Sequence, residues 1–158
     1  MVKTILTNKF GYPDLIVAAI EKVNSEYDGM KENSISVTAL IDSPRIDILR
    51  RSDNIVEVDV SEMLWTLMGL AMHVVLEKSS SRCLTEVRID LDIDYTTVLS
   101  GKLDYYDYNT KELSDWKFTS KYASREPKKE WVYQLNILKF LVEKKLGLEV
   151  KSLKNHLI

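Results

Sequence analysis

A change of hydrophobic period between residues 79 and 84 constrains the fold of this chain more than any other feature. Residues 59–78, DVSEMLWTLMGLAMHVVLEK, carry a wide apolar face at the spacing of an amphipathic helix. Residues 84–94, LTEVRIDLDID, instead alternate apolar and charged side chains, which is typical of a β-strand with one buried face. A helix followed at once by a strand must bury its apolar face against another element, so we expect a mixed α/β fold.

The flanking segments supply further elements. Residues 98–106 and 112–118 are expected to form two more strands, and the YNTK segment between them predicts an antiparallel hairpin. This order indicates an α/β fold bordering on α+β, with a central mixed sheet, an antiparallel meander and flanking helices. Ser36 is the expected N-cap of a short helix, and Gly147 the end of a long one. Helices are predicted over 14–28, 37–41, 44–51 and 128–146, with a last strand over 148–153.

Size and composition narrow the class of protein. The chain has 158 residues, which predicts a single domain, with a helical N-terminal part over 1–58 and a core over 59–158. We see no apolar run near the roughly 20 residues that span a bilayer and no secretion signal, so a cytoplasmic location is expected. A single cysteine excludes an internal disulfide and a cluster held by four cysteines. The net charge of −2 neither favours nor excludes a nucleic-acid partner.

The hairpin predicts a cluster of charge. A turn centred between Asn109 and Thr110 sets Asp104 opposite Asp115 on one face, and Lys117 lies on the same face because strand side chains alternate. Two adjacent carboxylates repel each other unless a proton or a cation relieves them. Hard oxygen ligands at this spacing suit Mg²⁺ or Mn²⁺, so the sequence predicts a divalent metal site.

Three other positions bear on this site. Gly101, inside a strand, indicates close approach of DNA or of a neighbouring helix. His73 lies one helical turn from Gly69 and from Glu77, where its ring could ligate a metal or simply bond a backbone carbonyl. Gln134 could bond a phosphate or a carboxylate, although a lone glutamine on a helix is usually solvated.

The ordered segments GLAMHVVLE, GKLDYYD, SDWK and YQL resemble the PD-(D/E)XK nuclease superfamily, in particular its RecB-like exonuclease branch. The resemblance spans residues 36 to about 141 and implies a restriction-endonuclease-like core. It implies that the metal is held by His73, Asp104, Asp115 and the backbone carbonyl of Trp116, that Lys117 is the catalytic lysine and that Glu86 orients the attacking water. Gln134 matches the glutamine of a Gln-x-x-x-Tyr motif, but the residue four positions later is Leu138. The iron–sulfur cluster of many relatives is excluded by the cysteine count.

The resemblance predicts a metal-dependent DNA nuclease, with an exonuclease that serves recombination, repair or DNA processing as the leading hypothesis. The small size of the chain would suit a phage protein. A structure-specific endonuclease of the junction-resolvase type and a DNA-binding module that no longer cuts remain as alternatives. We expect Lys117 to position water or stabilise charge, since two nearby carboxylates oppose its acting as a base. DNA contacts are predicted at Arg45, Ser120, Lys121 and Tyr106.

Overall fold

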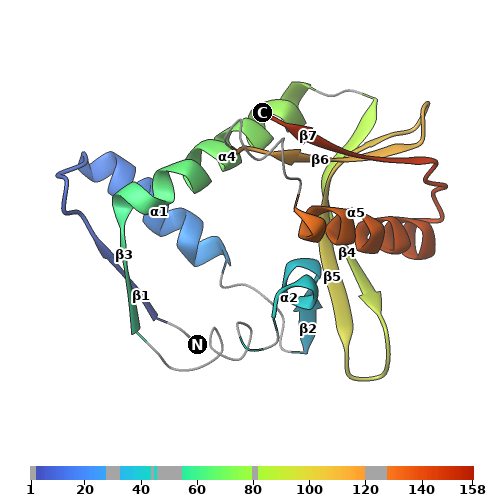
Figure 1. Ribbon diagram of the computed structural model, residues 1–158, viewed down its shortest axis with the longest axis horizontal. Helices are drawn as coiled ribbons and strands as arrows, with labels where there is room; N and C mark the ends of the chain where they lie inside the picture. Colours follow the sequence, from blue (N-terminus) through green and yellow to red (C-terminus); the bar gives the residue numbers. More distant parts are fainter. Residues whose placement is uncertain (1–2, 28–32, 44, 46–54, 80–81, 120–127) are drawn as a thin grey trace. The chain divides into compact units, whose positions relative to one another are not determined.

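The computed structural model describes residues 3–27, 33–43, 45, 55–79, 82–119 and 128–158. These residues divide by their contacts into two units (Figure 1). Unit 1 comprises Met1–Glu32 and Ser43–Met72, and unit 2 comprises Asn33–Asp42 and His73–Ile158. The two are described separately below, because each has its own sheet.

Unit 1 is built on a pair of parallel strands. β1 (Lys3–Thr7) pairs with β3 (Ile55–Asp59) in parallel, and helix α1 (Asp14–Tyr27) lies between them in the chain. The sequence predicted α1 but neither strand, so the expectation of a helical part over 1–58 was wrong in this respect. Each strand has five residues, and only pairing across some fifty positions of the chain stabilises them.

Helix α4 (Val60–Ser79) contains residues of both units, and its start is a capping box. Asp59 Oδ1 accepts from the Ser61 backbone N–H at 3.1 Å, and Glu62 Oε1 accepts from the Asp59 N–H at 3.4 Å. The Ser61 hydroxyl and the Lys9 N–H hold the pKa of Asp59 well below its ordinary value. By length and composition alone α4 is long and apolar enough to cross a membrane, which differs from our expectation that no apolar run approaches that length.

The sheet of unit 2 is mixed, as the sequence predicted. The central strand β5 (Val98–Asp107) pairs along one edge with antiparallel β4 (Cys83–Asp92). Its other edge is shared: β2 (Ser34–Ser36) pairs in parallel with its first residues, and β6 (Glu112–Lys117) pairs antiparallel with its last. β7 (Ser152–Leu157) adds to β6 in parallel, four residues later in the chain than the predicted strand. β2 was not predicted.

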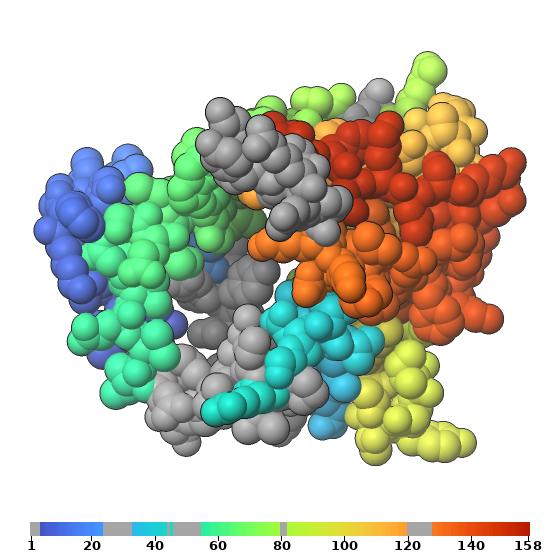
Figure 2. Space-filling view, in the orientation of Figure 1, coloured from blue at the N-terminus to red at the C-terminus, as the bar shows by residue number. Residues whose placement is uncertain are grey.

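Helices on one face of this sheet enclose the core. α2 (Val37–Ile41) packs against α5 (Lys129–Leu141), and Figure 2 shows the two side by side in cyan and orange. A π-helical turn, Val142–Leu146, extends α5 and ends at Gly147, whose φ is 66°. The Ser36 side chain accepts from the Ala39 N–H at 2.9 Å, so the predicted N-cap is confirmed. The helix predicted over 44–51 lies, apart from Arg45, outside the described residues.

Gly101 lies where the helices approach the sheet most closely. A Cβ at this position would stand 2.7–2.8 Å from side-chain atoms of Leu141, Leu138 and Val37. Of the two expectations for this glycine, close approach of a neighbouring helix is therefore confirmed. Leu138 is 1% exposed, so the residue that replaces the tyrosine of the resembled motif belongs to the core.

Candidate active site

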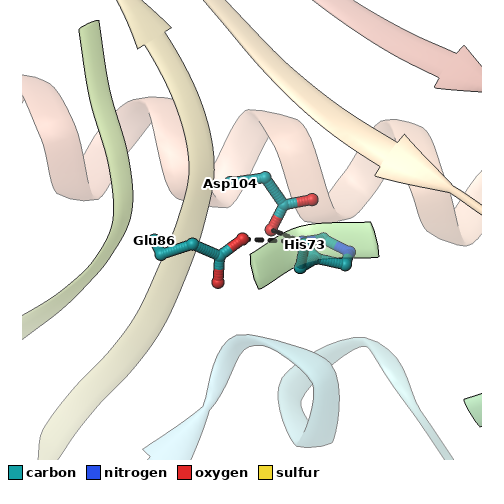
Figure 3. A group of neighbouring side chains, drawn as sticks. All are labelled: His73, Glu86 and Asp104. Atoms are coloured by element: carbon teal, nitrogen blue, oxygen red, sulfur yellow. Dashed lines mark hydrogen bonds and ion pairs between the residues drawn. The ribbon is translucent and has the colours of Figure 1, made fainter. Parts of the chain in front are cut away.

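Three elements of unit 2 bring an imidazole and two carboxylates together. His73 comes from the end of α4, Glu86 from β4 and Asp104 from β5, and one ligand atom of each lies within 4.8 Å of the others. His73 Nδ1 lies 2.6 Å from Glu86 Oε1 and 3.9 Å from Asp104 Oδ1, as the dashed lines of Figure 3 mark. These three side chains, here called the His–Glu–Asp cluster, converge although they are up to 31 positions apart.

Glu86 has an unusual backbone conformation. Its φ is 55°, in the left-handed region that a residue with a Cβ seldom adopts. Its neighbours Thr85 and Val87 pair with β5, so the irregularity is confined to one residue of an otherwise regular strand. Strain of this kind persists where the surroundings hold it, and here the Glu86 carboxylate bonds His73 and Lys102.

The hairpin places the two aspartates as predicted. Tyr105 pairs with Ser114, and this register has its centre between Asn109 and Thr110. The Trp116 backbone N–H donates to Asp104 Oδ2 at 2.9 Å, which ties the Asp104 carboxylate to β6. Burial and the charge of Asp115 raise the pKa of Asp104 to about 6.

Asp115 and Lys117 form the second part of the site. Lys117 Nζ lies 2.7 Å from Asp115 Oδ2 and donates to Gln134 Oε1, on α5, at 2.8 Å. Asp115 is 2% exposed, and burial raises its pKa although the Lys117 charge opposes the rise. The Lys117 ammonium therefore faces this buried oxygen as its ion-pair partner.

The charges of the cluster respond to one another. The hydrogen bond with Glu86, helped by the charge of Asp104, raises the pKa of His73 despite partial burial. Burial alone would raise the pKa of Glu86, but its bonds with His73 and Lys102 outweigh this and lower it. The site therefore holds an acidic carboxyl, Glu86, beside Asp104, whose pKa is elevated.

These residues fit a divalent cation. One imidazole nitrogen and carboxylate oxygens are ligands that Mn²⁺ accepts readily and Mg²⁺ accepts in part. The set differs from the predicted one, because Glu86 joins His73 and Asp104 while Asp115 is engaged by Lys117.

The four residues predicted to contact DNA differ in their exposure and in whether the structure describes them. Tyr106 is 2% exposed and its hydroxyl donates to the Glu149 carbonyl at 2.8 Å, so a role in contacting DNA was wrong. Its ring packs in the core because β5 turns this position toward the helices. Arg45 is exposed and belongs to unit 1, while Ser120 and Lys121 lie outside the described residues.

Sequence reasoning missed two residues beside the site. Lys102 forms an ion pair with Glu86. Because Lys102 lies two residues before Asp104 on β5, the alternation of strand side chains could have indicated that the two share a face. The His156 ring stacks on Trp116, with centroids 4.4 Å apart and planes 21° from parallel. No local pattern indicates this second contact, because it depends on the parallel pairing of β7 with β6.

Comparison with known proteins identifies a shared fold and nothing finer. No protein-family description matches the chain, and no curated protein matches it. A solved structure described as "Crystal structure of SSO0001" is similar with a TM-score of 0.59 and 20% sequence identity, over 91% of this chain and 70% of that one. At this identity the likeness establishes the mixed α/β fold alone.

Proposed function

We propose that this protein is a metal-dependent DNA nuclease that hydrolyses phosphodiester bonds, with a core of the PD-(D/E)XK type. The observation that carries the proposal is the convergence of the His–Glu–Asp cluster with the Asp115–Lys117 pair at one end of one sheet. Grouping carboxylates of elevated pKa costs stability, and such groups concentrate where chemistry needs them.

The chemistry follows from the charges. His73, Glu86 and Asp104 would hold Mg²⁺ or Mn²⁺, with the Trp116 carbonyl as a further candidate ligand. When bound, such an ion neutralises phosphate charge and makes water a better nucleophile at neutral pH. Lys117, fixed by Asp115 and Gln134, supplies a positive charge for the negative charge that develops on the phosphate.

The role of Lys117 follows from its partners. Lys117 Nζ lies 2.7 Å from the buried Asp115 carboxylate, and this ion pair holds the ammonium beside the cluster. Gln134 accepts from the ammonium and so sets its direction. Lys117 therefore orients water or stabilises charge, and Gln134 acts through Lys117.

Within this class we propose an exonuclease acting on DNA ends in recombination, repair or processing, located in the cytoplasm. The nuclease assay that tests the proposal also tests its alternatives. Linear and covalently closed circular DNA are incubated with the protein in Mn²⁺, Mg²⁺ or EDTA. Metal-dependent cutting of linear DNA alone supports an exonuclease, whereas cutting of circles supports an endonuclease.

A lysine variant separates catalysis from contamination. Lys117→Ala should lower the cutting rate at least about a hundredfold, the range that one electrostatic donor supplies at an active site. Lys111→Ala is the matched control, because Lys111 lies in the β5–β6 turn and pairs with Glu149 instead of the site. The alternative of a DNA-binding module that no longer cuts would be favoured if both variants lost cutting activity equally, or if the parent protein showed no metal-dependent cutting.

A further inference from the structure

A cavity of about 250 Å³ opens next to the His–Glu–Asp cluster, entirely within unit 2. Glu86 and Asp104 form part of its wall, so a group in the cavity lies beside the candidate metal ligands. The rest of the wall adds two aromatic residues, Tyr105 and Trp116, and the side of α4 that carries Glu77. The volume is below the roughly 300–1,000 Å³ of sites for drug-sized ligands, so it suits a single flat ring system.

The two aromatic rings are held in place before any ligand arrives. Tyr105 and Trp116 meet edge to face, with centroids 6.2 Å apart, and His156 stacks on Trp116. The Tyr105 hydroxyl accepts from Cys83 Sγ at 3.1 Å and donates to Asp107 Oδ2 at 3.5 Å. Side chains fixed in this way lose little conformational freedom on binding, which favours stacking of a planar ligand.

The polar groups of the wall select the kind of ring. Glu86 is already bonded to His73 and Lys102, and Asp104 accepts from the Trp116 N–H. Glu77 is exposed, with neither hydrogen bond nor ion pair in the described part of the chain. A free carboxylate accepts hydrogen bonds and donates none, so it favours a ring that presents an amino group.

Among the pyrimidines, a carboxylate acceptor distinguishes cytosine from thymine, which are similar in size. Cytosine presents its N4 amino group, which pairs well with glutamate, whereas thymine presents the O4 acceptor at the same place. We propose that the cavity binds the unpaired base of the nucleotide next to the reacting phosphate, stacked on Trp116 with Tyr105 at its edge, and that Glu77 selects cytosine over thymine. The inference rests on the proposed nuclease function and names the base-recognition subsite of that site.

The test uses mononucleotides, which contain no phosphodiester bond to cut. Deoxycytidine and thymidine 5′-monophosphates are titrated in Mg²⁺ into the full chain by calorimetry. The parent protein should bind the cytidine nucleotide about tenfold more tightly, as one well-placed base contact allows. Glu77→Ala should abolish the preference, while Glu21→Ala, which changes an exposed glutamate of α1, should keep it.

A second variant tests the stacking. Trp116→Leu should weaken both nucleotides about tenfold, because stacking on an aromatic ring does not depend on the base. Equal affinity of the parent protein for the two nucleotides, or a preference that survives Glu77→Ala, would overturn the subsite while metal-dependent cutting still supports a nuclease. Base-selective binding lost in Glu77→Ala supports the subsite even if no DNA is cut, in which case only the nuclease proposal fails.

Discussion

Replacement of Asp104 by asparagine tests the electrostatics of the site without any assumption about its ligand. Burial and the neighbouring Asp115 raise the pKa of Asp104 from 3.8 to about 6. The folded protein then binds this proton more tightly than the unfolded chain, so stability falls as pH rises between these values and stays low above them. Since one pKa unit corresponds to about 1.4 kcal/mol, the charge costs about 3 kcal/mol near neutral pH.

Asparagine keeps the shape of the side chain and an oxygen for the Trp116 N–H, but it carries no charge. In EDTA we therefore expect Asp104→Asn to be more stable than the parent protein by up to about 3 kcal/mol at pH 7.5. At about pH 4.5, where much of the parent protein carries the proton, the gain should fall to about 1 kcal/mol. Urea unfolding followed by tryptophan fluorescence measures both values.

Asp107, on the same strand, provides a control of opposite sign. Backbone N–H groups of Asn109 and Thr110 lower the pKa of Asp107, so its charge stabilises the fold above the ordinary pKa and this stability is lost in acid. Asp107→Asn should thus destabilise the protein near neutral pH, with a smaller effect in acid. The reasoning is refuted if Asp104→Asn is the less stable protein at about pH 7.5, or if its gain is the same at both pH values.

Three further results are expected. Gly101→Ala should lower the free energy of unfolding in urea by about 1–3 kcal/mol, because the added Cβ meets packed helix side chains. The loss should be smaller when Leu138 is also replaced by alanine, and additive effects of the two changes would contradict the contact. Tyr106→Phe should lower the free energy of unfolding by about 0.5–1.5 kcal/mol, because it removes the hydrogen bond to the Glu149 carbonyl, and it should leave DNA affinity unchanged. Weaker DNA binding by a stably folded variant would restore a role in DNA contact. Mn²⁺ should raise the melting temperature of the parent protein in a calorimetric scan more than that of His73→Ala, and equal shifts would remove His73 from the ligand set.

Local patterns in the sequence predicted most of the elements of unit 2. The alternation of residues 84–94 and 98–106 and the turn after them placed β4, β5 and the hairpin register, because side-chain period and turn chemistry act over a few residues. The register in turn predicted that Asp104 and Asp115 share a face. The strands of unit 1 and β2 escaped prediction because each is short and is stabilised by a partner far along the chain.

The charged groups that could form a site were therefore determined by the sequence, and so was the strand pairing that brings two of them together. The tertiary structure alone decided that Glu86 meets His73, that Lys117 is shared by Asp115 and Gln134, and that Tyr106 belongs to the core. The physical reason is that these contacts join different elements. Their geometry depends on how α5 packs against the sheet and on where the end of α4 places His73, and no period along the chain encodes either arrangement.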